Sequence, residues 1–451
     1  MVDISISKPK SQKENYLSAF ESFEKGIDRK TLAWIHQARK SAIDRFRTLG
    51  FPTMREENWK YTNVGPIAET PFKFASDFNP SALSVEKIKP FLFSQNNWQR
   101  LVFVNGFYSK ELSSITNSKN GLKLVNFEPA LASDSKLMEP YLARLARYEQ
   151  NGFTALNTAF FRDGAFIYVP DGKTLDEPIH LLFISLPKDE SIVSYPRTLI
   201  VSGKDSKATI VESYVSIGTG NYFTNAVTEI VLGNGASLDH YKLEKESEGA
   251  FHIGTVQVHQ ESDSKFSSSS VTMGARLARN SLTVSLNGEG TECHLNGLYL
   301  ASGEQHVDNT TLIDHLKPRG TSRQFYKGIV GGKATAVFNG KIFVHENAQR
   351  TDAEQTNKNL LLSEGATADT RPQLEILNDD VKCTHGAAVG QLDEEAVFYL
   401  KTRGINEEAA RKLLSYGFAN EVIDRIKVKA IRTELNRELL VKLETLSNGR
   451  S

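Results

Sequence analysis

The sequence predicts a mainly β protein whose core is a right-handed parallel β-helix, a solenoid of stacked coils, flanked by α-helical regions at both ends. From about Leu101 to Leu392, short apolar or alternating runs are separated by Gly, Asn, Asp and Ser, the pattern of strands followed by turns. A turn of small residues followed by a new strand also recurs about every 30 residues, as in SKATIVE, NGASLDH, GEGTECHL, GGKATAVF and SEGATADT. A sandwich, a barrel or a propeller would also hold many strands, but this loose recurrence favours an irregular solenoid.

The region 1–100 is predicted to be mainly helical. Apolar residues fall at roughly helical spacing between Glu14 and Leu49, and Gly50 and Pro52 then end the helical pattern. The residues of this stripe are Leu17, Phe20, Ile27, Ile35, Ala38, Ala42 and Phe46. The aromatic segment EENWKYTNV that follows is expected to pack against the rest of the protein.

The solenoid is predicted to span 101–392, and the region 393–451 is helical again. Asp393 and Asn406 are expected to cap two successive helices, the first of which ends before Gly404. The second carries the stripe Ala410, Leu413, Leu414, Gly417 and Phe418, and a third segment from about Glu421 repeats Ile431, Leu435 and Leu439. We expect the solenoid to bury only its last coil against these helices, which leaves apolar surface either for packing among the helices or for a partner.

The composition excludes several classes of protein. Lys+Arg and Asp+Glu both number 54, so the basic excess typical of nucleic-acid binding is missing. The two cysteines, Cys293 and Cys383, are too few for a secreted disulfide framework. The sequence has no run of about 18 apolar residues and no apolar segment typical of a signal peptide, so we expect a cytoplasmic protein with no membrane contact.

Common catalytic motifs are also missing. The sequence has no G-x-x-x-x-G-K-[ST] loop and no strand–GxGxxG–helix unit, so we expect neither ATP hydrolysis nor dinucleotide binding by this chain. It has no G-x-S-x-G elbow and no H-E-x-x-H motif either. These observations predict that the chain is not an enzyme by itself.

The segment NDDVKCTHGAAVGQLD contains the candidate site residues. If it is a strand, Val381, Cys383 and His385 point to one face, because side chains alternate along a strand. A thiolate and an imidazole suit iron or zinc, but a tetrahedral site needs four ligands, so the others would come from a neighbouring coil or another subunit. The alternative is a small buried cysteine beside a hydrogen-bonded histidine.

A second group of polar residues carries a weaker signal. His294, His306 and His315 follow one another in the sequence, but their spacing matches no metal motif, so structural roles are expected. Lys327, Asn339 and Gln349 lie in consecutive predicted coils, and no function follows from their chemistry.

From Asn157 to Phe418 the chain resembles the SufB/SufD family of iron–sulfur cluster assembly scaffolds. The matching segments include NTAFFRDGAFIYVP, DNTTLIDH, SRQFYKGIV, AVFNGKIFV, AQRTDAEQTNKNLLLSEGA, RPQLEILNDDVKCTHGAAVG and FYLKTRGI, and NWKYT extends the resemblance toward the N-terminus. Within the family the form KCTHGA resembles the SufD branch. The SufB branch has a cysteine where this chain reads SEGATADT, and acidic residues beside the histidine that corresponds to His385.

The resemblance implies a scaffold subunit that pairs with SufB through its β-helix and holds the ATPase SufC on its C-terminal helices. ATP would then be bound by SufC, which agrees with the missing phosphate loop. His385, with Cys383 beside it, would contribute to a transient iron or iron–sulfur cluster site at the SufB interface, with no permanently bound cofactor. A homodimer in the absence of SufB is also compatible with the resemblance.

Two other functions are weighed against this one. The chain would be a purely structural spacer between SufB and SufC if His385 were inert. A β-helix enzyme acting on polysaccharides needs clustered carboxylates, but the adjacent Asp379 and Asp380 would point to opposite faces of a strand. A variant of His385 distinguishes the site from the spacer.

Overall fold

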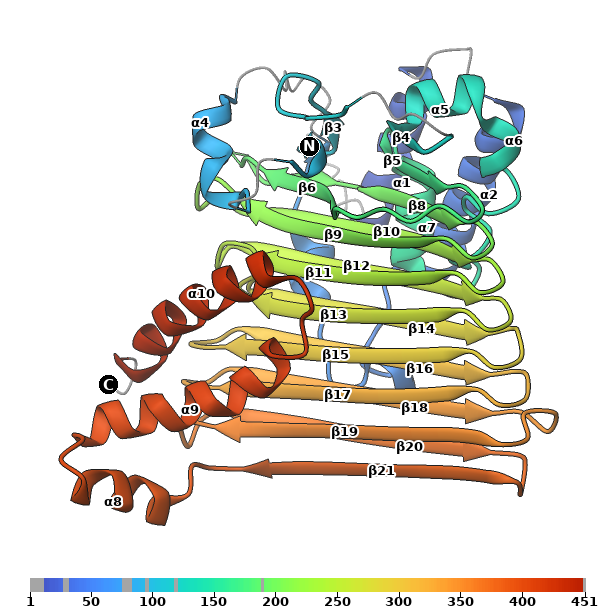
Figure 1. Ribbon diagram of the computed structural model, residues 1–451. Coiled ribbons are helices and arrows are strands. Elements are labelled where there is room, and N and C mark those ends of the chain that lie inside the picture. Colours follow the sequence, from blue (N-terminus) through green and yellow to red (C-terminus); the bar gives the residue numbers. More distant parts are fainter. Residues whose placement is uncertain are drawn as a thin grey trace, which may run out of the picture.

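The computed structural model describes residues 12–26, 32–74, 83–93, 97–116, 121–187 and 190–448. The described strands form two sheets that face each other along a solenoid (Figure 1). Sheet A contains β1 (Lys73–Phe74), β4 (Lys123–Asn126), β5 (Gly164–Val169), β7 (Ile192–Ser194), β8 (Arg197–Ser202), β10 (Tyr222–Leu232), β12 (Ala250–Gln260), β14 (Leu277–Leu286), β16 (His306–His315), β18 (Thr335–Val344) and β20 (Thr367–Ile376). Sheet B contains β2 (Gln99–Val104), β3 (Phe107–Tyr108), β6 (Ile179–Ser185), β9 (Lys207–Ser216), β11 (Ser237–Lys245), β13 (Lys265–Met273), β15 (Glu292–Ala301), β17 (Thr321–Val330), β19 (Thr351–Leu361) and β21 (Val381–Gly390).

Each coil of the solenoid contributes one strand to each sheet, and successive coils pair in parallel. In sheet B, for example, Ser237 of β11 pairs with Lys207 of β9 on one side and Lys265 of β13 on the other. Paired residues point to the same face, so a column of side chains runs down the interior of the solenoid. The predicted β-solenoid with helical regions at both ends is confirmed.

The N-terminal region contains short helices that pack on the first coils. They are α1 (Gln12–Lys25), α2 (Ala33–Leu49), η1 (Glu57–Trp59), α3 (Gly65–Glu69), α4 (Val85–Ile88) and η3 (Lys89–Phe91). The continuous helical stretch predicted from Glu14 to Leu49 is therefore two helices, and Ile27 lies outside the described residues. Gly50 ends α2 with a positive φ of 68°, as glycine readily allows.

The aromatic segment after α2 packs against the outer face of sheet A. The Arg279 guanidinium of β14 stacks on the Trp59 ring at 3.9 Å from its centroid. The Thr62 hydroxyl lies 3.0 Å from Nε2 of His306 and donates a hydrogen bond to Asp308, which also pairs with Arg279. The expected packing role of this segment is thereby confirmed.

The predicted range of the solenoid also contains helices. These are α5 (Phe127–Ser133), α6 (Ser135–Met138) and α7 (Gly152–Phe160). Every residue of α7 is buried, including the polar Thr154, Asn157 and Thr158, so this helix lies inside the protein with no face exposed to solvent. Its Asn151 cap accepts hydrogen bonds from the backbone N–H groups of Phe153 and Thr154.

The C-terminal helices are α8 (Glu394–Thr402), α9 (Glu407–Ile423) and α10 (Lys429–Asn448). Asp393 and Asn406 cap α8 and α9 through their side-chain oxygens, as predicted. The predicted stripe of α9 is partly wrong, because Leu413 is 50% exposed while Ala419, Val422 and Ile423 of the same helix are buried. The third segment begins at Lys429 and not at Glu421, which still belongs to α9.

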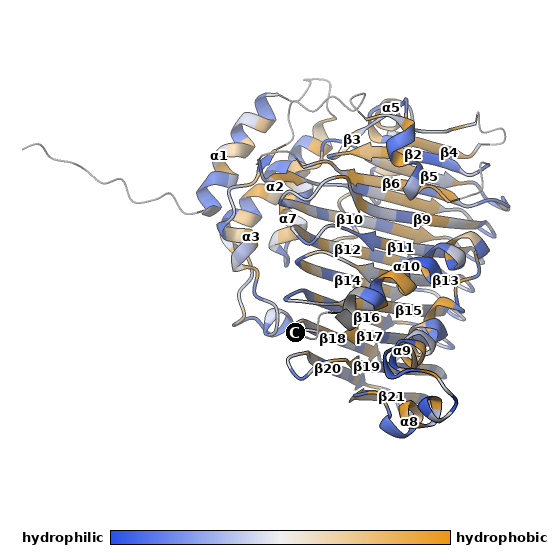
Figure 2. Ribbon diagram, turned by 90° about the vertical axis from the view of Figure 1, so that its left-hand side faces the viewer, coloured by the Kyte–Doolittle hydropathy of each residue, from blue (hydrophilic) through white to orange (hydrophobic). Residues whose placement is uncertain are grey.

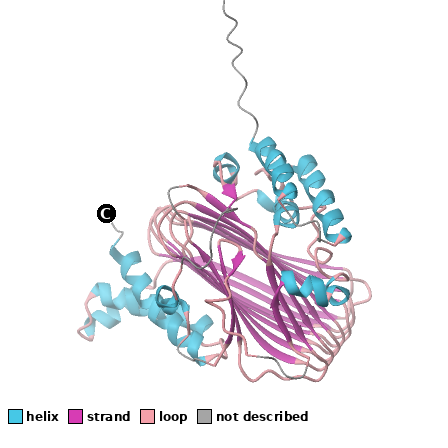
Figure 3. Ribbon diagram, turned by 90° about the horizontal axis from the view of Figure 1, so that it is seen from above, coloured by secondary structure: helices cyan, strands magenta, loops and turns pink. Residues whose placement is uncertain are grey.

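The expectation that these helices cover the last coil is wrong. They pack instead along the outer face of sheet B, where Ile431, Leu435 and Leu439 of α10 share an apolar cluster with Tyr241 and Leu243 of β11. Figure 3 shows the C-terminal helices beside the strands, on a different flank from the N-terminal helices. The reason is that β11 and its neighbours are apolar on their outer face and require a cover there.

The last coil is consequently left open at one end. Most residues of β21 are exposed and β20 is half-buried to exposed along its length, although every residue of β10 is buried. Figure 1 shows no strand beyond β21, which is the terminal strand of sheet B. Among the described helices, none is long and apolar enough to cross a membrane.

Candidate functional site

The candidate residues lie on β21, the last strand of the solenoid. Val381 and Cys383 are partly buried against the interior apolar cluster, while Lys382 and Thr384, which alternate with them along the strand, are exposed. His385 has the same parity as Cys383 and therefore faces the interior side, about 7 Å further along the strand. The predicted strand and its alternation are confirmed, and His385 is exposed because no further coil covers it.

The thiol of Cys383 is half-buried and not activated. Burial raises its pKa, and the nearby Asp352 carboxylate raises it further against an opposing hydrogen bond from the Ala353 backbone. The thiol is therefore protonated at neutral pH. Cys293 is fully buried, and burial raises the pKa of its thiol as well, which suits a structural residue.

His385 continues a column of interior side chains. It pairs in register with Gln355 of β19, which in turn pairs with Gln324 of β17. The imidazole therefore stands at the mouth of the solenoid, where it is accessible from outside, and the amide side chains before it in the column are buried. A neutral imidazole in this position is a competent iron ligand.

Within the described ranges, no three or more His, Cys, Asp and Glu side chains gather in a way that could hold a metal ion. Cys383 and His385 thus supply two potential ligands of the four that a tetrahedral site requires. Asp379 and Asp380 lie in the exposed bend before β21. On its own, this chain offers part of a ligand set at an accessible edge.

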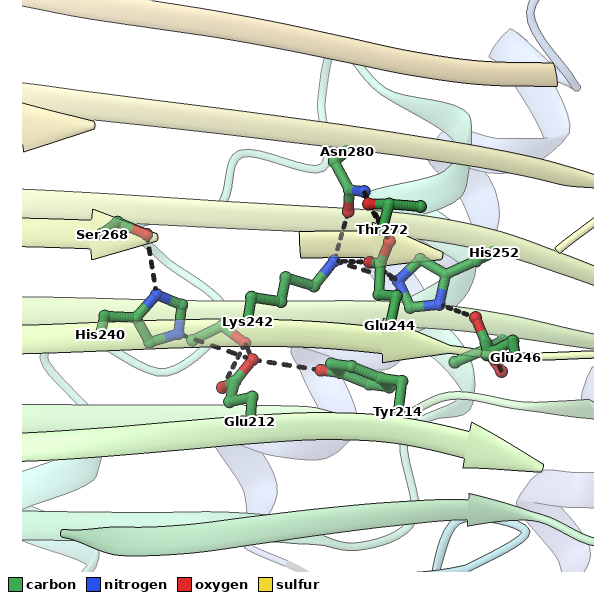
Figure 4. A network of polar contacts seen from close by, with 12 residues as sticks. Glu212, Tyr214, His240, Lys242, Glu244, Glu246, His252, Ser268, Thr272 and Asn280 are labelled. Carbon is green, nitrogen blue, oxygen red and sulfur yellow. Dashed lines mark hydrogen bonds and ion pairs between the residues drawn. The ribbon is translucent and has the colours of Figure 1, made fainter. Parts of the chain in front are cut away.

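The structure contains a buried ionic network that the sequence analysis missed (Figure 4). Lys242 of β11 pairs with Glu244 at 2.5 Å, approaches His252 of β12 at 3.1 Å and donates to Asn280 of β14. His252 also lies 2.8 Å from Glu246. All of these side chains are inside the solenoid, in contrast to the usual exposure of charged residues.

A second part of the network surrounds Glu212 of β9. Tyr214 donates a hydrogen bond of 3.2 Å to its carboxylate, and Nε2 of His240 lies 3.8 Å away. Burial alone raises the pKa of Glu212, but the interactions with His240 and Thr228 outweigh it and lower the pKa. Similarly, burial raises the pKa of Glu244, but His252 and Lys242 hold it well below its usual value. The carboxylates are therefore ionised and held by fixed partners.

The other histidines that were singled out do not come together. His294 lies on the outer face of sheet B, His306 on the outer face of sheet A beside Thr62, and His315 inside, 3.0 Å from the Ser322 hydroxyl. Burial lowers the pKa of all three. Their separation agrees with the expected structural roles.

Lys327 has a role that its sequence position did not predict. Its ammonium group lies on the outer face of β17 and is nearly fully buried. It donates to the Phe418 carbonyl at 3.0 Å and pairs with Glu421 at 2.7 Å. Lys327 thus fastens α9 to the solenoid.

Comparisons with known proteins agree with this architecture. The model of the SufBD core domain of the SUF system for FeS cluster assembly matches residues 185–418, and that of the SufBD N-terminal region matches residues 10–181. An iron–sulfur cluster assembly SufBD family protein of Synechocystis is 34% identical over 88% of this chain and 89% of its own length. The iron–sulfur cluster assembly protein SufD of Escherichia coli is 31% identical over 88% of this chain and 90% of its own length.

A SufB protein matches a smaller share of the chain. The SufB protein of Bacillus subtilis is 28% identical over 72% of this chain and 69% of its own length. The similarity to SufD thus extends further along both chains, which agrees with the KCTHGA form around His385. This chain belongs to the SufBD family of iron–sulfur cluster assembly proteins.

Proposed function

We propose that this chain is the SufD-type scaffold subunit of a SufBCD complex, pairing with SufB through its open last coil and holding the ATPase SufC on its C-terminal helices. The observation that carries the proposal is the uncovered end of the solenoid, with His385 at its mouth. Relatives named SufD and SufB among the similar proteins support the same context. The proposal includes a cytoplasmic location.

The open end has the properties of a pairing surface. β20 and β21 are edge strands of ten residues each, and each presents unpaired backbone N–H and C=O groups on its outer side. An uncovered edge of this length favours the addition of a partner strand, which supplies affinity through main-chain hydrogen bonds. When SufB is missing, a second copy of this chain would pair with the same edge strands in its place.

The cluster or iron is cargo in this proposal and is not a resident cofactor. His385 would donate a nitrogen lone pair, and Cys383 would add a thiolate once its proton is displaced. The partner subunit would complete the ligand set, because the described residues of this chain supply too few ligands alone. A site divided between two subunits allows a change in their relative position to load or release the cargo.

The C-terminal helices are suited to docking an ATPase. These helices expose the large apolar side chains of Phe398 (68% exposed), Tyr399 (56%), Leu413 (50%), Leu440 (44%) and Val441 (51%), whereas the opposite faces of α9 and α10 are buried against sheet B. Lys327 fastens α9 to β17, and Lys245 fastens α10 to β11 through Glu434 at 3.0 Å. A movement of docked SufC would therefore be transmitted to the strands of sheet B.

The decisive experiment replaces His385 in the assembled complex. We expect His385→Ala to lower the iron and acid-labile sulfide bound per complex by about tenfold or more, because a ligand is lost. His345→Ala is the matched control, since this half-buried histidine pairs with Asp314 at 2.8 Å away from the proposed site. Unchanged cluster loading in His385→Ala would favour the structural spacer.

The docking surface is tested without removing the helices, because truncation would uncover the apolar outer face of sheet B. We expect either Phe398→Glu with Tyr399→Glu, or Leu440→Glu with Val441→Glu, to abolish co-purification of SufC while SufB is retained. The double variant that loses SufC identifies the helix face to which SufC binds. If both double variants still retain SufC, the proposed docking surface is wrong.

A further inference from the structure

A row of amide side chains crosses the interior of the last coils and ends at the proposed site. Nε2 of Gln324 donates to the hydroxyl of Thr311 in sheet A at 2.6 Å. Oε1 of Gln324 then accepts from Nε2 of Gln355 at 2.7 Å. Gln324 donates to β16, the strand directly before its own, and Gln355 donates to Gln324 in the preceding coil, so both amide nitrogens point toward earlier strands and the row has a fixed direction.

The last oxygen of this row has no partner. Gln355 is fully buried, and its Oε1 has no hydrogen-bond partner among the described residues. Nε2 is engaged with Gln324 on one side, and the residue paired with Gln355 on the next strand, on the other side, is His385. A buried carbonyl oxygen without a donor costs free energy, so a donor at this position is favoured.

We propose that Gln355 is a positioning residue for His385: its Oε1 accepts the ring N–H of His385 and so directs the other ring nitrogen, with its lone pair, out of the mouth of the solenoid. The inference deepens the proposed function, because iron would bind that lone pair. It requires the exposed imidazole of His385 to rotate toward Gln355, its neighbour on the same face of the sheet.

The direction of the amide row decides which ring nitrogen of His385 carries the proton. A neutral imidazole has one N–H and one lone pair, and the hydrogen bond made by one nitrogen fixes the state of the other. A carbonyl oxygen at Gln355 selects an inner N–H and an outer lone pair. An amide nitrogen in the same place would select the opposite tautomer, whose outer nitrogen carries a proton and cannot bind a metal. Metal-bound histidines commonly donate to such a carbonyl or carboxylate.

The test measures the tautomer of His385 in the full chain labelled with 15N in its histidine rings. Long-range 1H–15N spectra are recorded at about pH 8, where an ordinary imidazole is neutral, and His385→Asn identifies the signal among the ten histidines. The wild type is expected to show one tautomer. Gln355→Leu should show a mixture, Gln355→Glu should keep one tautomer because it keeps an acceptor, and Gln373→Leu on the outer face of β20 should leave the signal unchanged.

A mixture of tautomers in the wild type, or an unchanged single tautomer in Gln355→Leu, would overturn the proposal. Thermal unfolding shows whether Gln355→Leu folds. If it does not, the wild-type and Gln355→Glu spectra still show whether His385 has a single tautomer. In the complex, Gln355→Leu should lower iron loading about tenfold. Unchanged loading in this variant would overturn the positioning role, whereas failure of the proposed function is seen separately in His385→Ala.

Discussion

The first coils and the last coil of the solenoid differ in how their strands are covered. Every residue of β8 and β10 is buried, and N-terminal helices pack against this end. By contrast, β20 is mostly half-buried and β21 is mostly exposed. Figure 2 shows the strands around β5 and β6 mostly in orange and the strands near β19 with more blue. The first end is covered by helices of the chain itself, whereas the last strands have no such cover among the described residues.

Two buried polar groups, one near each end of the solenoid, differ in how fully they are paired. At the first end, the buried ion pair of Arg197 and Glu229 at 2.7 Å is fully provided with partners, because Glu229 also accepts from the backbone N–H groups of Ala143, Leu145 and Ala146. At the last end, the buried oxygen of Gln355 has no donor among the described residues.

The largest expected effect of a substitution is therefore at the first end. Glu229→Ala leaves the Arg197 guanidinium buried without its carboxylate and removes the acceptor of three backbone N–H groups. We expect a loss of about 3–5 kcal/mol in the free energy of unfolding, measured by urea denaturation. A loss below about 1 kcal/mol would contradict the view that this end is completed internally.

Acid should destabilise the middle of the solenoid through His315. Burial lowers the pKa of His315 from 6.5 to about 4, so the fold favours its neutral form. This contribution is fully present above pH 6.5, the unfolded value, and is lost as the pH falls toward 4; its full size is about 3 kcal/mol. Urea denaturation at several pH values should show this slope, and His315→Gln should reduce it.

His252 should act in the opposite direction. Burial lowers its pKa, but the Glu244 and Glu246 carboxylates outweigh burial and the net pKa is raised above 6.5. Its contribution to stability is present below pH 6.5 and is lost as the pH rises through the raised pKa. We expect His252→Gln to remove a decline in stability on the alkaline side that the wild type shows. An identical alkaline slope in both proteins would contradict the ionic network.

The sequence predicted the solenoid because its strands and turns recur, but it did not predict which face of each strand points inward. In β11, the usual rule places Tyr241 and Leu243 inside and Lys242 and Glu244 outside. The structure has the reverse, because α10 covers the outer face and the interior holds an ionic network. Because a helix distant in sequence covers the outer face of this strand, its apolar side chains lie outside and its charged ones inside. The local alternation alone does not reveal this reversal.

The candidate site was predictable for a different reason. Cys383 and His385 lie two residues apart on a strand, so their common face follows from local geometry. That the strand is the last of the solenoid, and that Gln355 stands behind His385, depends on register between coils about 30 residues apart. Such long-range pairing is invisible in a single sequence without an internal repeat that is regular enough to align.

The smallest expected effect is at the last coil, where the same substitution tests both ends. Val258 of β12 is fully buried in the interior cluster, and Val389 of β21 faces the interior side but is 43% exposed. Val258→Ser should cost about 2 kcal/mol or more in the isolated chain, because it leaves a cavity and buries a hydroxyl. Val389→Ser should cost less than about 0.5 kcal/mol there.

If a partner covers the last coil, Val389→Ser weakens co-purification with SufB while Val258→Ser affects it only through loss of fold. Equal costs in the isolated chain would mean that the last coil is already protected by this chain or by a second copy of it, and the contrast between the two ends would not hold.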